Sequence, residues 1–122
     1  MIAQWIAVGA GGFVGAMCRY GIGLLPVKEG SLFPFKTCFI NIAGCFVIGL
    51  IAAMALKHPT WDTRVIAFLK AGLCGGFTTF SSFALETEGL MQSGHMGLAL
   101  LYVCISVVVG ICAVFAGQML AQ

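Results

Sequence analysis

The sequence predicts an all-α membrane protein that crosses the bilayer with four transmembrane helices. Hydrophobic residues make up 61% of the chain and charged residues only 8%, whereas a soluble domain carries roughly a quarter charged residues. The mean hydropathy is +1.07. A helix needs about 20 mostly apolar residues to cross a hydrocarbon core of about 30 Å, so 122 residues hold four spans and little else. We expect a single transmembrane domain over residues 1–122.

Hydropathy and helix breakers predict spans near residues 3–25, 37–56, 64–91 and 97–121. The first span lacks a preceding basic segment and stays apolar to Leu25, so we interpret it as a retained helix rather than a signal peptide. The connectors at 26–36, 57–63 and 92–96 are short and hold the prolines and several charges. An even number of spans places both termini on one side of the membrane.

Basic residues are shared equally between the two sides of the predicted topology. One side holds Arg19, Lys28 and Lys36, and the other holds Lys57, Arg64 and Lys70. The excess of lysine and arginine that normally sets orientation is therefore missing. Two alternatives follow: the chain inserts both ways and forms an antiparallel homodimer, or these few charges do not report the orientation. A net charge of +2 without a basic cluster argues against nucleic acid as a partner.

Small residues recur where the helices should meet. Gly11 and Gly15 form a GxxxG pair, and further glycines lie in later spans at Gly44, Gly49, Gly110 and Gly117; such positions let helix backbones approach closely. The six cysteines are dispersed without a CxxC pair, so we interpret them as packing residues rather than as disulfides or metal ligands.

The third span contains a segment that forms a continuous helix poorly. Gly75 and Gly76 are followed within six residues by four hydroxyl side chains, and we expect a helix break at about 75–78. Unpaired backbone groups cost several kcal/mol each in hydrocarbon, so a break requires burial in protein or a polar cavity. Broken helices can coordinate cations through carbonyl groups and attract anions at helix N-termini. The alternative is a kinked but continuous helix.

After the break, helical spacing sorts the side chains into two neighbouring stripes. The polar stripe is formed by Thr79, Ser82 and Glu86. The stripe that carries aromatic rings is formed by Phe80, Phe83 and Thr87. Asn41 and Glu86 lie well inside spans, where polar and ionisable groups are functional candidates. Tyr102 and Ser106 add a polar edge on the fourth span. Arg19 lies near an interface, where its side chain can reach water.

The run Gly72-Leu-Cys-Gly-Gly-Phe-Thr-Thr-Phe-Ser-Ser-Phe83, preceded by Arg19 and Asn41 and followed by Glu86, resembles the bacterial fluoride channel family, of the Fluc or CrcB-like type. The resemblance covers essentially the whole chain. It implies a multi-pass protein of the inner (plasma) membrane that is not an enzyme. The implied activity is passive, fluoride-selective conduction that exports fluoride from the cytoplasm and reduces its toxicity. The implied assembly is a dual-topology antiparallel homodimer in membrane lipid, with two fluoride pathways.

The resemblance also implies roles for individual residues. The fluoride pore would be formed by Asn41, Thr79, Phe80, Ser82, Phe83, Glu86, Tyr102 and Ser106. Arg19 and Ser81 would line an aqueous vestibule. A structural sodium ion at the dimer interface would be held by the backbone carbonyls of Gly75 and Thr78 from both subunits. Gly110 departs from the family pattern, since some members continue the polar track there with a serine; water could replace the missing hydroxyl.

The implied chemistry suits a small, strongly hydrated anion. A pore must replace the water around fluoride with donors that do not trap the ion. Phenyl ring edges carry the positive end of the ring quadrupole, and the Asn41 amide and the hydroxyls can donate hydrogen bonds. No lysine or arginine is expected in the constriction, because a full positive charge there would slow release.

Three other classes of function compete with a channel. A proton-coupled drug antiporter of four spans would carry a carboxylate in its first span, and residues 3–25 contain none. An inert membrane assembly factor would not need a broken span with hydroxyl and phenylalanine side chains. An intramembrane enzyme would need a nucleophile, a base and metal ligands that converge, and the sequence shows no such set.

Overall fold

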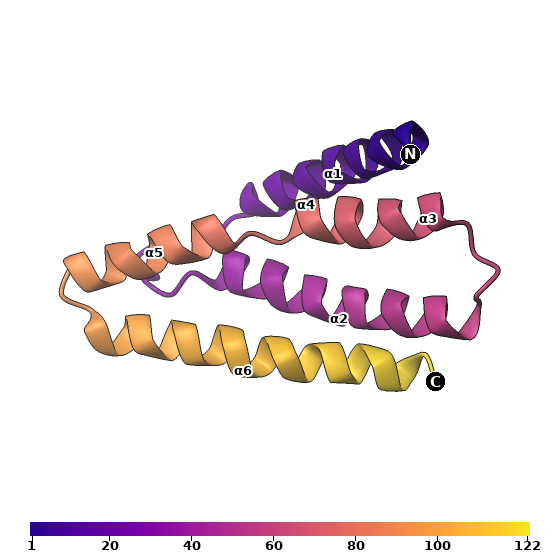
Figure 1. The fold of residues 1–122 in the computed structure, drawn as a ribbon. Helices are drawn as coiled ribbons and strands as arrows, with labels where there is room; N and C mark the ends of the chain where they lie inside the picture. The colour runs from indigo at the N-terminus through magenta and orange to yellow at the C-terminus, as the bar shows by residue number, and fades with distance from the viewer.

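The computed structural model describes residues 1–122 as an all-helical protein (Figure 1). Four helical stretches are long and apolar enough to cross a membrane, which confirms the four predicted spans. They are α1 (Ile2–Gly23), α2 (Phe35–Lys57), a composite third span (Thr63–Gln92) and α6 (Met96–Leu120). Each end lies within two residues of the bound expected from hydropathy.

The third span is composite, and its break confirms the expectation of a discontinuous helix. It comprises α3 (Thr63–Ala67), the π-helical η1 (Phe68–Cys74), α4 (Gly75–Phe77) and α5 (Phe80–Gln92). The predicted place of the break, 75–78, was wrong for all but its last residue. Gly75–Phe77 remains helical, and the extended residues are Thr78 (φ −79°, ψ 158°) and Thr79 (φ −147°, ψ 115°).

Glycines of the third span pack against α1 instead of ending the helix. A Cβ atom added at Gly15 would lie 2.3 Å from the Leu73 carbonyl oxygen, and one added at Gly76 would lie 2.6 Å from that of Gly12. Only residues without side chains allow the two backbones to approach this closely. Glycine also allows close packing of α2 and α6, since a Cβ at Gly117 would lie 2.2 Å from the Phe46 carbonyl oxygen.

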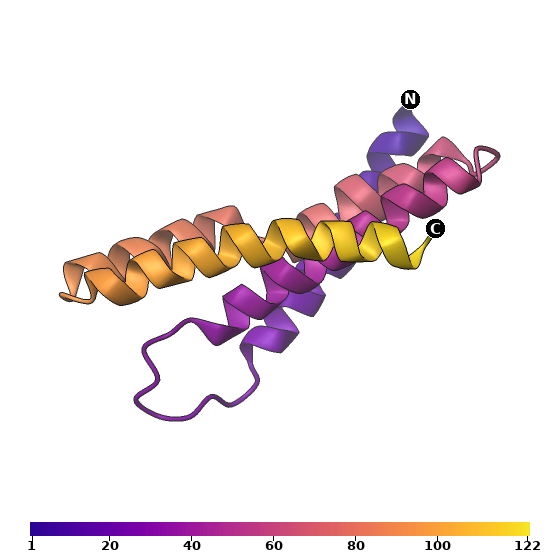
Figure 2. The same cartoon turned by 90° about the horizontal axis from the view of Figure 1, so that it is seen from below.

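The helices therefore form two closely packed pairs. Figure 1 shows α1 beside the α3–α4 half of the third span, and α6 beside α2. Viewed from below, α6 crosses α2, and the connector between α1 and α2 loops out beyond the helix ends (Figure 2). The half-helix α5 continues beyond the break and packs on α6. The break thus lies where the two pairs meet.

The second connector leads into the third span through a charged cap. The Asp62 carboxylate accepts a hydrogen bond from the Arg64 amide (2.8 Å) and pairs with the Arg64 guanidinium (2.6 Å). The side-chain hydrogen bonds from Arg64 lower the pKa of Asp62 to about 2. Asp62 therefore stays ionised at neutral pH and caps α3.

Gly15→Ala should lower the free energy of unfolding by about 1–3 kcal/mol, the usual cost of overpacking. The new methyl group would meet backbone atoms of Leu73 and Phe77, which cannot move aside as a side chain can. Thermal unfolding in detergent measures the change. Gly9→Ala is the matched control on α1, because nothing lies within 4 Å of its added Cβ; equal melting of both variants would contradict close packing at Gly15.

Candidate functional site

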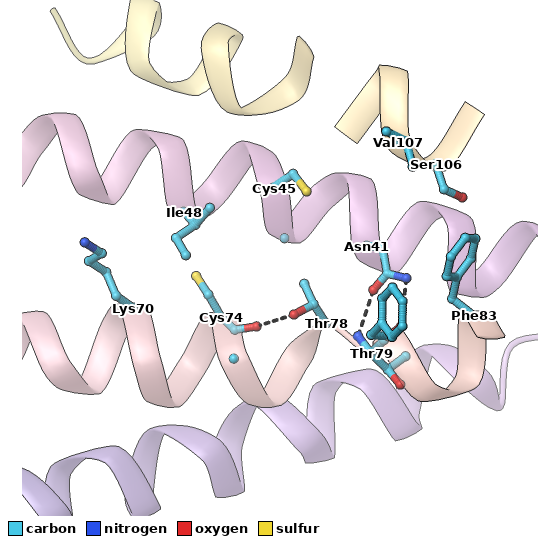
Figure 3. A pocket seen from close by; sticks show the side chains of 13 residues that line it. Asn41, Cys45, Ile48, Lys70, Cys74, Thr78, Thr79, Phe83, Ser106 and Val107 are labelled. Atoms are coloured by element: carbon cyan, nitrogen blue, oxygen red, sulfur yellow. Dashed lines mark hydrogen bonds between the residues drawn. The ribbon is translucent and has the colours of Figure 1, made fainter. Parts of the chain in front are cut away.

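The break in the third span is held by one side chain of α2. The Asn41 amide nitrogen Nδ2 donates to the Thr79 carbonyl (3.0 Å), and the Thr79 N–H donates to Asn41 Oδ1 (2.8 Å) (Figure 3). In a continuous helix the Thr79 N–H would donate to the Gly75 carbonyl. Asn41 therefore supplies both partners that the extended residue lacks, which makes the break tolerable inside a membrane.

Hydroxyl groups complete the two helix ends around the break. Thr78 Oγ1 and the Thr78 N–H both donate to the Cys74 carbonyl, at 2.9 and 3.1 Å. On the other side Thr79 Oγ1 accepts from the Ser82 N–H (3.2 Å) and so caps α5. Arg19, expected near a membrane interface, also contacts the break, because its Nε donates to the Gly76 carbonyl (3.2 Å). A cation is also favourable at this place, since it lies at the C-terminal end of α4.

A groove of about 360 Å³ opens beside the break, between α2, α6 and the third span (Figure 3). It brings together seven of the residues predicted for the pore or the sodium site, and adds others that were not predicted. The predicted residues in its lining are Asn41, Gly75, Thr78, Thr79, Phe80, Phe83 and, from α6, Ser106. The remaining lining residues are Gly44, Cys45, Ile48, Lys70, Cys74 and Val107.

The two phenylalanines predicted for the pore meet in this groove but differ in environment. Their ring centroids lie 5.7 Å apart with an interplanar angle of 59°. The Phe80 side chain is 79% exposed, whereas Phe83 is half-buried and packs edge-on against Tyr102 at 5.0 Å. The Phe83 ring is therefore held in place by Tyr102, whereas the Phe80 ring is accessible to a molecule that packs on the groove.

A second hollow, of about 440 Å³, lies on the other side of the break. It contains the predicted vestibule residue Arg19 and the polar stripe of Thr79, Ser82 and Glu86, together with the basic side chain of Lys36. Thr79 lines both hollows. Ser81, the other predicted vestibule residue, is exposed and lines neither; its hydroxyl lies 3.5 Å from Thr79 Oγ1.

Glu86 is the centre of a small polar network that the sequence only partly predicted. Its two carboxylate oxygens accept hydrogen bonds from Thr37 Oγ1 (2.7 Å) and from the Tyr102 hydroxyl (2.8 Å). Tyr102 is fully buried, and Thr37 is 8% exposed. Thr37 was not predicted, although it lies four residues before Asn41 and so shares a face of α2.

Ser106 and Gly110 do not continue this network. The Ser106 hydroxyl lies 4.0 Å from Cys38 Sγ and lines the groove instead. Gly110 is buried, and a Cβ added there would lie 3.4 Å from Cys45 Sγ. A side chain at this position would therefore meet the Cys45 thiol but no backbone atom of α2.

The residues that are expected to bind sodium have some of the features that a hard cation requires. Gly75 and Thr78 both line the groove. The Thr78 carbonyl accepts no hydrogen bond from the chain, and the Thr79 N–H donates to Asn41 rather than to the Gly75 carbonyl. Carbonyl oxygens left free in this way are the ligand type that hard cations such as sodium prefer.

Comparison with known proteins shows the family of this chain. A family model described as CrcB-like protein, Camphor Resistance (CrcB), matches residues 6–118. The chain belongs to the CrcB-like family. The matched range contains every residue predicted for the pore, the vestibule and the sodium site, from Arg19 to Ser106.

Curated relatives of this CrcB-like chain carry the name fluoride-specific ion channel FluC. One from Azobacteroides pseudotrichonymphae is 39% identical over 123 aligned positions, covering 100% of this chain and 98% of the relative. One from Chlorobaculum tepidum is 42% identical over 117 positions, covering 96% and 93%. One from Agrobacterium fabrum is 40% identical over 116 positions, covering 94% and 93%.

Proposed function

We propose that this protein is a fluoride-selective passive ion channel, not an enzyme, that exports fluoride from the cytoplasm and so reduces its toxicity. One observation carries the proposal beyond the names of its relatives. Two hollows, one with Arg19 and Lys36 and the other with the phenylalanine rings, adjoin at Thr79, where the helix is interrupted and α5 begins. A route past this point would run alongside polar groups on both sides of the break.

The chemistry of such a route follows from the donors along it. Hydroxyls of Thr79 and Ser82, ring edges of the phenylalanines and the positive N-terminal end of α5 each attract an anion weakly. Several weak sites in succession replace water around fluoride and still release it. Asn41 commits one N–H and its oxygen to Thr79, so its second N–H remains for the ion.

Glu86 plays an organising role on this route. Its carboxylate accepts hydrogen bonds from the Thr37 and Tyr102 hydroxyls. It also ties α5 to α2 and α6. Tyr102 in turn supports the Phe83 ring, so the network positions the part of the groove that the ion passes.

We further propose a dual-topology antiparallel homodimer as the functional unit in the inner (plasma) membrane. The groove is lined by Gly75, Thr78 and the largely exposed Phe80, and lipid could not satisfy the free carbonyl groups there. A second copy that covers the groove would do so. The equal distribution of six basic residues over the two sides favours copies of opposite orientation.

A structural sodium ion at that interface is the proposed cofactor. The carbonyls of Gly75 and Thr78 from both copies would hold it and would offset mutual repulsion between the broken helix ends. Replacing sodium on both sides of the membrane with a bulky organic cation should weaken fluoride flux or dimer stability, as measured by efflux and by size-exclusion chromatography. Complete indifference to the replacement would contradict the ion.

Purified protein in liposomes tests the proposed function directly. We expect fluoride efflux that follows the electrochemical gradient without proton coupling, recorded with a fluoride electrode. Proton-driven efflux of an organic cation would indicate an antiporter instead. The absence of any fluoride flux would reject the channel.

Phe80→Ile and Phe83→Ile should slow fluoride flux while leaving the protein assembled. An aliphatic side chain lacks the positive ring edge that faces an anion. Phe83→Ile should also lower thermal stability by more than Phe80→Ile, because only the Phe83 ring packs on Tyr102. Flux at the wild-type level in both variants would show that these rings do not line the pore.

A further inference from the structure

One basic side chain that lines the groove, Lys70, has no role in the function proposed above. Lys70 lies in η1, seven residues after the span begins at Thr63, which corresponds to a helix rise of about 10 Å. It is exposed on the surface of the chain and makes no hydrogen bond or ion pair with it. The carboxylate at the α3 end, Asp62, is already paired with Arg64, and the acidic side chains of the span, Glu86 and Glu88, lie in α5, beyond the break.

An ammonium group at this depth is costly unless water or an anion reaches it. Lys70 lines the same groove as Asn41 and Phe83. Figure 3 shows it at the end of the groove away from Phe83, with its amine directed away from the break and toward the α3 end. Water or anions admitted at that end of the groove would stabilise the ammonium group.

We propose that Lys70 forms a cationic mouth of the groove, where it raises the local concentration of fluoride at the end of the route opposite the Arg19 and Lys36 hollow. The proposal rests on the proposed channel function and adds a residue to it. A basic side chain would then stand at each end of the route and attract the anion from either side. Because Lys70 lies apart from Phe80 and Phe83, its charge attracts the ion without trapping it at the constriction.

The opposing explanation is that the lysine stem only extends along apolar surface to carry the amine to lipid headgroups. The two explanations differ in what they predict for flux. A charge at the mouth of a conducting groove changes the rate, and screening by salt removes its effect. A lysine in contact with headgroups has no effect on the rate at any ionic strength.

The experiment compares Lys70→Gln with wild type by fluoride efflux from liposomes at ionic strengths of about 10 mM and about 1 M, where the Debye lengths are about 30 and 3 Å. Sodium is held constant, and ionic strength is raised with a potassium salt of an impermeant organic anion. We expect efflux to fall roughly threefold to fivefold at low ionic strength and to approach the wild-type rate at high ionic strength. Lys70→Arg, which keeps the charge, should conduct like wild type.

Lys28→Gln is the matched control, because Lys28 lies in the first connector and lines neither hollow. Equal efflux of Lys70→Gln and wild type at both ionic strengths would overturn the inference and leave the channel intact. A loss that is the same at both ionic strengths, or that Lys70→Arg shares, would also overturn it by indicating a packing defect. Absence of fluoride flux in wild type would reject the channel itself.

Discussion

Replacing Asn41 with leucine should reduce fluoride flux by at least about tenfold and destabilise the protein. The substitution leaves the N–H and the carbonyl of Thr79 without their partners, and each unpaired buried group costs about 1–3 kcal/mol. The break can respond only by admitting water or by rewinding toward a continuous helix. Either response displaces Thr79, which lines both hollows. Efflux from liposomes and thermal unfolding in detergent measure the two effects.

Ile48→Leu is a suitable control for that experiment, because Ile48 lines the same groove on the same helix and makes no polar contact. It should retain flux and stability, since volume-conserving swaps cost little. Asn41→Asp separates the roles of the two amide atoms: it keeps an acceptor for the Thr79 N–H and loses the donor. Wild-type flux in the leucine variant would show that Asn41 does not hold the conducting form of the break.

Replacing Glu86 with leucine should produce the second large loss. It leaves the buried hydroxyls of Thr37 and Tyr102 without a hydrogen-bond acceptor. Each unpaired hydroxyl lowers the free energy of unfolding by about 1–3 kcal/mol. It also releases the tie between α5, α2 and α6, so the Phe83 ring loses the support of a fixed Tyr102. We expect lower thermal stability in detergent and fluoride flux lowered by about tenfold or more.

Glu88→Leu provides the matched comparison two residues further along α5. Glu88 is exposed and makes no hydrogen bond within the chain, so its loss should change neither measurement. A double-mutant cycle with Thr37→Val tests the network itself. The double variant should be less destabilised than the sum of the single variants; strict additivity would show that the two side chains do not act together.

The position of the break shows where sequence reasoning was misled. Adjacent glycines predict a helix break, since glycine costs about 1 kcal/mol in a helix interior. In the folded protein Gly76 is helical and closely packed against Gly12, and the helix ends one residue later, at Phe77. Asn41 ends the helix, because its Oδ1 accepts the hydrogen bond of the Thr79 N–H. A partner 38 residues away leaves no local pattern to find.

Other site residues were missed for a similar reason. Thr37 and Lys36 stand at the start of α2, where a polar side chain is ordinary, and only the approach of α5 and α1 makes them part of a hollow. Lys70 was counted as a charge near one membrane side, but the structure places it in the lining of the groove. The π-helical turn around Lys70 was also not predicted, because such turns are rare and occur mostly as single turns within α-helices.

The sequence by itself determined the membrane setting, the number and limits of the spans, the discontinuity of the third span and the family. These properties depend on the summed hydropathy of about 20 residues or on a contiguous motif, and both can be counted along a chain. Only the tertiary structure decided that the break falls at Thr78 and Thr79, that Glu86 holds two hydroxyls, and that the two hollows adjoin at Thr79. These depend on hydrogen bonds between helices, which form only after packing has brought distant residues together.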